Sequence, residues 1–144
     1  MRIALAADHA GYALKDELVA WLREKGHEVS DLGTNGPESV DYPEFGAKAA
    51  WAIANGEADR AIVICGSGIG ISIAVNRNPA CRCARVSDPL SAELAREHND
   101  ANVLTLGGKT ISYEQMREIV RVWLSSDLTE ERHRRRVAKI DSLL

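Results

Sequence analysis

The feature that most constrains the fold is the stretch 60–65, Arg-Ala-Ile-Val-Ile-Cys, which is β-branched and apolar without alternating polar residues. Such a strand is expected where helices cover both faces of a sheet. Short apolar stretches at 2–7, 29–32, 81–86 and 103–106 also read as strands, separated by segments with helical spacing. Five strands alternating with helices predict an α/β fold with a parallel sheet between two helical layers.

The helices are predicted from their start and stop residues. The first is expected between Gly11 and Gly26, the second from Pro43 to about Asn55, and the third after Gly70 to about Asn76. The fourth should begin at Asp88-Pro89, the fifth at the cap Ser112, and the last should run from Thr129 to about Asp141. Leu90, Leu94 and His98 share one stripe of the fourth helix. The fifth is expected to bury Met116, Ile119, Val120 and Trp123, and the last carries an apolar stripe of Val137, Ile140 and Leu144 that could pack on its own chain or on a partner subunit.

Composition narrows the class of protein. The 144 residues, 45% hydrophobic, suit a single domain over 1–144 with its own core. A net charge of −3 argues against a surface devoted to nucleic acid. No apolar run approaches the roughly 18 residues of a membrane helix, and the apolar N-terminal run is too short for a signal peptide. Three cysteines exclude a fully paired disulfide set. We therefore expect a cytoplasmic protein with reduced thiols.

Ligands of parallel α/β sheets bind beyond the carboxyl ends of the strands. After the third predicted strand come Gly66, Gly68 and Gly70, whose backbone, with a helix N-terminus, suits a phosphate or an oxyanion. The alternative is a tight turn that binds nothing. Ile71 stands where a dinucleotide fingerprint needs glycine, and no Gly-Lys-Ser/Thr of a nucleotide-binding loop follows.

Cys65 directly precedes that turn. A helix N-terminus stabilises a thiolate, so Cys65 could act as a base or nucleophile; equally, it could be a small buried apolar residue. A phosphatase loop would need arginine at position 71, which is Ile71. Cys81 and Cys83 lack further ligands for a metal site and are expected to be structural.

Polar residues also gather elsewhere. Asp8 and His9 end the first predicted strand, and His98 is followed by Asn99. Taken alone, His98 is more simply a half-buried histidine. Two arginines of the basic last helix, Arg132 and Arg136, are four residues apart and share one face, as suits a phosphate dianion, although such runs are usually solvated.

Five motifs in order resemble the B-type ribose-5-phosphate isomerases, a family that includes galactose- and allose-6-phosphate isomerases. They are Asp-His-Ala-Gly at 8–11, Val-Asp-Tyr-Pro at 40–43, Cys-Gly-Ser-Gly-Ile-Gly-Ile-Ser-Ile-Ala at 65–74, Arg-Glu-His-Asn-Asp-Ala-Asn-Val-Leu at 96–104, and Arg-His with Arg-Val at 132–137. The resemblance spans essentially the whole chain. It implies a Rossmann-like three-layer fold and a cofactor-free, metal-free aldose–ketose isomerase of the pentose phosphate pathway, interconverting ribose 5-phosphate and ribulose 5-phosphate.

The resemblance also implies roles for individual residues. Cys65 would move the proton between C2 and C1, His98 would help open the sugar ring, and Ser67 with the turn amides would stabilise the enediolate. The substrate would be held by Asp8, His9, Tyr42, Asn99, Arg132 and Arg136, together with Gly66, Gly68 and Gly70. The family pattern implies a homodimer or homotetramer whose sites are shared between chains, with the last helix contacting the partner.

Two departures from that pattern stand out. Position 67 is Ser where many members have Thr, which keeps the hydroxyl. Lys109 stands near where several members carry a phosphate-binding Arg, which keeps the charge but loses the bidentate fork. The alternatives are therefore an isomerase of another sugar phosphate, such as allose or galactose 6-phosphate, and a non-catalytic sugar-phosphate-binding protein.

Overall fold

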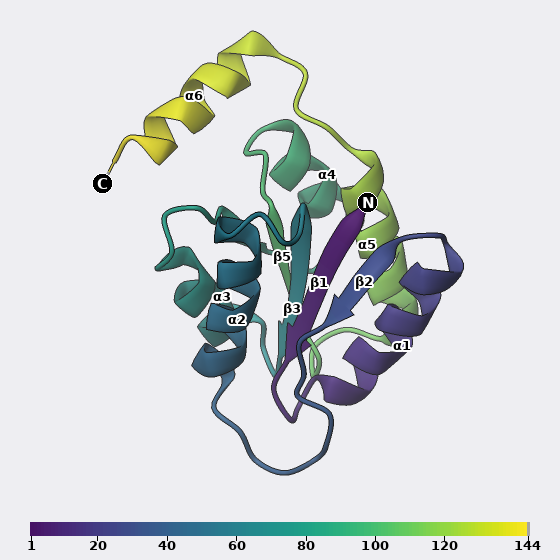
Figure 1. Cartoon of the computed structure of the whole chain (residues 1–144). Helices are drawn as coiled ribbons and strands as arrows, with labels where there is room; N and C mark the ends of the chain where they lie inside the picture. Colours follow the sequence, from purple (N-terminus) through teal and green to yellow (C-terminus); the bar gives the residue numbers. More distant parts are fainter. Residues whose placement is uncertain (144) are drawn as a thin grey trace.

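A parallel sheet of five strands forms the centre of the computed structural model, which describes residues 1–143 (Figure 1). The strands are β1 (Arg2–Ala7), β2 (Glu28–Asp31), β3 (Arg60–Cys65), β4 (Cys83–Arg85) and β5 (Val103–Gly107), in the order β2-β1-β3-β5-β4. In the register of the central strands, Ala7 pairs with Ile64 and Cys65 with Gly107. Their carboxyl ends therefore meet at one edge of the sheet.

Helices cover both faces of this sheet. They are α1 (Tyr12–Glu24), α2 (Tyr42–Ala54), α3 (Ile69–Asn76), α4 (Pro89–Glu97) and α5 (Tyr113–Ser125). One core joins Ile62 and Ile64 to the apolar faces of α1, α4 and α5. The other joins Ala61, Val63 and Cys65 to α2 and α3. Since neighbouring strand residues face opposite sides, the unbroken apolar run of β3 fills both cores, which confirms the predicted α/β architecture.

A sixth helix, α6 (Glu131–Asp141), lies apart from these layers, beyond the amino ends of the strands (top of Figure 1). His133 and Val137 are its buried residues, while Ile140 is 45% exposed. Leu144, the last residue of the predicted apolar stripe, lies outside the described residues. Helix α6 therefore packs against its own chain through few residues.

Two local predictions were wrong. The predicted strand 81–86 is shortened to Cys83–Arg85, so Cys81 lies before β4 rather than beside Cys83 on one strand. The stripe beginning at Leu90 is not the buried face of α4, because Leu90 is 62% exposed. That helix instead buries Ala92, Ala95 and Arg96.

Arg96 is the charged member of this buried face. Its guanidinium donates to the Ala101 carbonyl at 2.9 Å and meets the Asp100 carboxylate at 2.8 Å, so its charge is compensated. The predicted buried face of α5 is confirmed, since Met116, Ile119, Val120 and Trp123 are all buried. Within residues 1–143, no helix has the length and apolar character needed to span a membrane.

Candidate active site

Cys65 is the last residue of β3, and its side chain is 4% exposed. Its carbonyl accepts a hydrogen bond from the Gly108 amide at 2.7 Å, which ties the end of β3 to the turn after β5. The thiol lies at the end of the core that α2 and α3 cover. β3 therefore places Cys65 at the carboxyl edge of the sheet, largely shielded from water.

The turn that follows Cys65 is shaped by Gly68. This residue has φ +76°, and a Cβ there would lie 2.9 Å from the backbone carbon of Leu106. Glycine is thus required both for the left-handed backbone and for the close approach to β5. The result is a compact turn at the start of α3, where the first amides of the helix have no partner within it.

Two side chains complete this turn. The Ser67 hydroxyl accepts from the Ile69 amide at 3.1 Å, which leaves its own proton free to donate. The ring of Tyr42, at the start of α2, lies so close to Gly70 that a Cβ there would be 2.6 Å from it. Lys109 lies beside Gly66 and is exposed. A hydroxyl donor, the amides at the start of α3 and the Tyr42 ring therefore gather at the turn that directly follows Cys65.

Asp8 and His9 follow β1 at the same edge. Oδ1 of the buried Asp8 accepts from the amides of Ala10 and Gly11 at 2.9 and 3.2 Å. Nδ1 of His9 accepts from the Val40 amide at 3.1 Å. Because an amide can only donate, the neutral His9 ring carries its proton on Nε2. His9 is thereby oriented as a hydrogen-bond donor.

The remaining predicted site residues lie at the opposite edge of the sheet. His98 caps the end of α4 and stacks on His133 of α6, with ring centroids 4.1 Å apart and an interplanar angle of 23°. Burial lowers the pKa of His133, and His98 beside it lowers it further. On α6, Arg132 and Arg136 are exposed. Together, His98, Asn99, Arg132 and Arg136 form what we call the amino-edge cluster.

One chain cannot bring this cluster to Cys65. β3 runs from Arg60 at the amino edge to Cys65 at the carboxyl edge, and five residue steps of extended strand span about 16 Å. Asp8, His9, Tyr42, Ser67 and the three glycines of the turn lie with Cys65. The predicted site residues therefore fall into two groups at opposite edges of one sheet, which we call the predicted half-sites.

Comparison with known proteins identifies the relatives of this chain. A profile of the Ribose/Galactose Isomerase family matches residues 3–140. The chain belongs to that family. Ribose-5-phosphate isomerase B of Escherichia coli is 44% identical over 142 residues, which are 99% of this chain and 95% of that protein. The resemblance seen in the sequence motifs is thus confirmed.

Solved structures agree with this family. A ribose-5-phosphate isomerase B of Clostridium thermocellum has a TM-score of 0.97 at 48% identity, over 99% of this chain and 97% of that one. The ribose-5-phosphate isomerase B of Mycoplasma genitalium, solved with bound ribulose-5-phosphate, has a TM-score of 0.92 at 35% identity, over 97% and 93%. The five-stranded parallel α/β fold is therefore shared with these isomerases.

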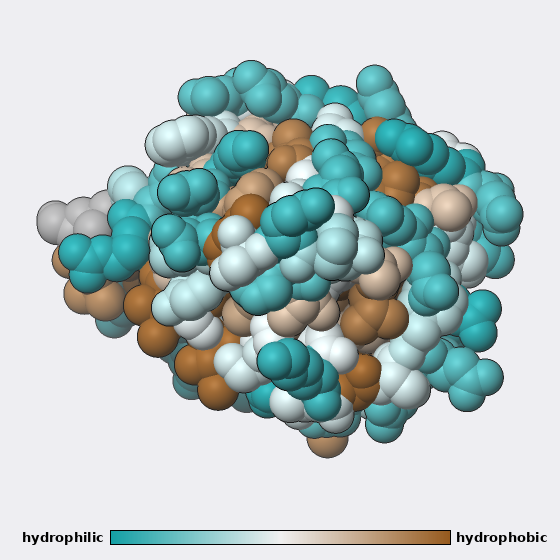
Figure 2. All heavy atoms as spheres, turned by 90° about the horizontal axis from the view of Figure 1, so that it is seen from below, coloured by the Kyte–Doolittle hydropathy of each residue, from teal (hydrophilic) through white to brown (hydrophobic). Residues whose placement is uncertain are grey.

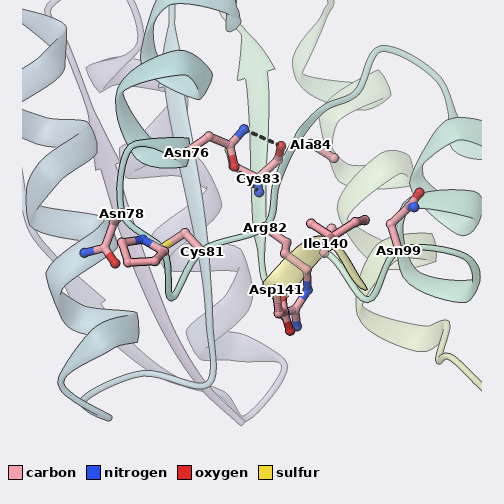
Figure 3. A pocket seen from close by; sticks show the side chains of 11 residues that line it. Asn76, Asn78, Cys81, Arg82, Cys83, Ala84, Asn99, Ile140 and Asp141 are labelled. Atoms are coloured by element: carbon pink, nitrogen blue, oxygen red, sulfur yellow. Dashed lines mark hydrogen bonds and ion pairs between the residues drawn. The ribbon is translucent and has the colours of Figure 1, made fainter. Parts of the chain in front are cut away.

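A cavity of about 370 Å³ in this isomerase-family chain, drawn in Figure 3, does not have Cys65 in its lining. It opens between the end of α3, β4 and the end of α6, and Asn99 lines it. Beside it, Arg82 meets the carboxylate of Asp141 at 3.1 Å and donates to the Asp100 carbonyl at 3.1 Å. Arg82 therefore fastens the end of α6 to the turn that carries Asn99.

The other two cysteines, Cys81 and Cys83, lie in surroundings that keep their thiols protonated. Cys81 is buried, and Cys83 packs against the same core as Cys81. Burial raises the pKa of the Cys81 thiol to about 11 and also raises that of Cys83. Both therefore stay protonated at neutral pH, in keeping with a structural role.

Sequence reasoning missed Lys15. This lysine of α1 is wholly buried, and its Nζ lies 2.7 Å from carboxylate oxygens of Asp16 and Asp31. A signal was available, because Lys15 lies three residues before Leu18 and seven before Leu22, on the face that packs on the sheet.

Proposed function

We propose that this protein interconverts ribose 5-phosphate and ribulose 5-phosphate, with Cys65 as the proton-transfer base. The observation that carries the proposal is the buried thiol at the end of β3, set directly before a glycine-rich turn with free amides. Proton abstraction beside a carbonyl needs a base and a donor for the developing oxyanion, and this edge of the sheet offers both. The names of the relatives favour this substrate over allose or galactose 6-phosphate.

The proposed reaction begins with the open-chain aldose. The Cys65 thiolate removes the proton from C2, and the electron pair forms the C1–C2 double bond of an enediolate. Amides of the turn and the Ser67 hydroxyl stabilise the negative oxygen. The hydroxyl proton on O2 then passes to O1. Cys65 returns its own proton to C1 while O2 becomes the carbonyl oxygen, which yields the ketose and regenerates the thiolate.

Other residues would bind the sugar phosphate. Asp8, Tyr42 and Asn99 are proposed to contact sugar oxygens, and His98 to open the ring. His9, a donor through Nε2, would share the phosphate with Arg132 and Arg136, whose planar forks suit a dianion. Binding the unreacting phosphate would supply energy to position C1 and C2. No metal or organic cofactor has a role in this scheme.

The scheme requires a homodimer, because the half-sites lie at opposite edges of one chain. A second copy would bring its amino-edge cluster to Cys65, and the symmetric contact would complete two sites at once. Two exposed apolar residues of α3 lie near the carboxyl edge, Ile69 and Ile73, at 52% and 62% exposure. Figure 2 views that side and shows hydrophobic patches among hydrophilic side chains. Covering such residues favours association.

The reaction is tested with a panel of sugar phosphates in deuterated water. The purified protein should isomerise ribose 5-phosphate and place solvent deuterium on the reacting carbon. Preference for allose or galactose 6-phosphate would replace the pentose assignment. A non-catalytic binding protein would bind ribose 5-phosphate and exchange no proton, which would refute the proposal. Localisation to the cytoplasm is expected for an enzyme of the pentose phosphate pathway.

A further inference from the structure

Lys15 occupies a position that is costly for a lysine. Its side chain is wholly buried, and its ammonium lies between Asp16 and Asp31 and 3.2 Å from Oδ1 of Asn35. Burying an ion pair rarely stabilises a fold more than apolar residues of similar size. We therefore look for a role of the buried Lys15 ammonium other than stability alone.

The contacts of Lys15 lead to the start of the segment that joins β2 to α2. Asp31 ends β2, and its Oδ1 accepts from the Gly33 amide at 3.0 Å as well as from Lys15. Asn35 lies two residues farther along. Lys15 thus ties α1 to the start of this segment through two side-chain oxygens. Backbone hydrogen bonds to β1 already hold residues 32–34, so the contact with Asn35 is what Lys15 adds at the point where the segment leaves the sheet.

The same segment ends on the active-site histidine. Val40, near its end, donates its amide to Nδ1 of His9 at 3.1 Å. Between Asn35 and Val40 the segment is mostly exposed, so its path depends on how its two ends are held. Val40 itself packs against the core that α2 and α3 cover, so the exposed stretch 36–39 is the part through which a shift at Asn35 would reach its amide. Nδ1 of His9 then loses the donor that keeps it unprotonated.

We propose that Lys15 is a positioning residue, which holds the segment 32–41 so that the Val40 amide fixes His9 with its proton on Nε2. The donor face of His9 is then directed at an anionic oxygen before substrate arrives. Pre-set donors bind developing or resident negative charge without the cost of reorganisation. The inference rests on the proposed function for its consequence, phosphate binding by His9, but its structural part concerns the free protein.

The test is Lys15→Met, a side chain of similar length without the charge. Nitrogen-15 NMR of the imidazole in the substrate-free protein should show His9 as the Nε2–H tautomer in wild type and as a mixture in the variant. Hydrogen exchange of the Val40 amide should accelerate. KM for ribose 5-phosphate should rise roughly tenfold or more, with a smaller change in kcat.

Asp16→Asn is the matched control. It removes the other carboxylate that meets Lys15 but leaves the contacts to Asp31 and Asn35. The His9 tautomer and KM should therefore match wild type. A His9 signal disturbed as much in Asp16→Asn as in Lys15→Met would overturn the proposed route through the segment.

A second pair of variants separates positioning from stability. Lys15→Met combined with Asp31→Asn leaves only the half-exposed carboxylate of Asp16 without its partner, so the free energy of unfolding should largely recover while the His9 tautomer stays mixed. Recovery of the tautomer together with stability would show a merely structural lysine.

If Lys15→Met does not fold, Asn35→Ala removes only the link to the segment, and an unchanged His9 would contradict the proposal. If wild type fails to isomerise ribose 5-phosphate, the proposed function falls, while the NMR result still decides the role of Lys15.

Discussion

The two edges of the sheet are built in different ways. At the carboxyl edge, Cys65, Asp8 and Gly68 are buried, and backbone hydrogen bonds from neighbouring turns hold this edge in place. At the amino edge, Arg132 and Arg136 are exposed on a helix that touches the rest of the chain through His133, Val137 and the Arg82–Asp141 ion pair.

This difference follows from what each edge is proposed to do. The proton-transfer step needs a base and an oxyanion cradle fixed before substrate binds, which a buried strand end provides. Charged side chains that bind a phosphate must extend from the surface to the ligand and need not be buried. Substitutions at the carboxyl edge should therefore affect chemistry and stability, and those on α6 should affect binding.

The largest expected effect is that of Cys65→Ala. Loss of the base should lower kcat by roughly a hundredfold to ten-thousandfold, with little change in affinity for a phosphate-bearing inhibitor. Steady-state kinetics with ribose 5-phosphate measures the first and calorimetry the second. Cys81→Ala, which also removes a buried thiol, should keep its kcat. Similar losses in both variants would mean that Cys65 acts through packing.

Mixing two inactive chains tests whether the half-sites come from different copies. Cys65→Ala and His98→Asn should each be nearly inactive alone. Co-expressed in equal amounts, half of the dimers would be mixed and would hold one intact site of two, so about a quarter of wild-type activity should return. Each variant disables every site if both residues act within one chain, and activity would then stay at the level of the separate variants.

A smaller effect is expected for Arg136→Ala on the amino edge. Removing one phosphate contact should raise KM for ribose 5-phosphate roughly tenfold to a hundredfold, while kcat and the free energy of unfolding change little. Arg135→Ala makes the same change of charge on another face of the helix. Equal effects of the two variants would reduce the role of Arg136 to general electrostatic attraction.

The sequence was sufficient for the carboxyl edge because its signals are local. The apolar run of β3, the glycines after it and the polar pair Asp8-His9 each report a strand end, and parallel strands bring such ends together. The amino edge could not be placed this way. The motif around His98 precedes β5, yet nothing in the spacing says that α6 brings His133 onto it.

Charged residues in buried positions were the second limit. Arg96 lies on the buried face of α4 with Ala92 and Ala95, and Lys15 lies on the core side of α1, because partners elsewhere in the chain compensate their charges. Periodicity treats such residues as solvent-facing. Their burial depends on Asp31 and on the Ala101 carbonyl, contacts that only the folded chain defines.

Stability should also distinguish the edges, through Gly68→Ala. The left-handed backbone and the contact with Leu106 together should lower the free energy of unfolding by roughly 2–4 kcal/mol. Gly56, with φ +72° and open space where a Cβ would stand, is the control for backbone strain alone. Gly56→Ala should cost about 1 kcal/mol. If urea unfolding gives the same loss of unfolding free energy for Gly68→Ala and Gly56→Ala, the backbone of β5 at Leu106 moves aside at little cost.

The smallest effect is expected at the amino edge, from pH. Burial chiefly, and then His98, lower the pKa of His133 below its ordinary value of 6.5; Arg132 and Arg136 act in the same direction, and Glu130 opposes them. Between the lowered pKa and 6.5 the unfolded chain binds more protons than the folded one, so stability contributed by His133 is present above 6.5 and is lost as pH falls through this window.

His133→Phe retains an aromatic ring to stack on His98 but cannot titrate. Its urea midpoint should therefore fall less than that of wild type between about pH 7.5 and pH 5. Because His27, whose pKa burial also lowers, is present in both proteins, the difference between the two slopes isolates His133. Equal slopes would mean that α6 is held at the amino edge without help from a neutral His133.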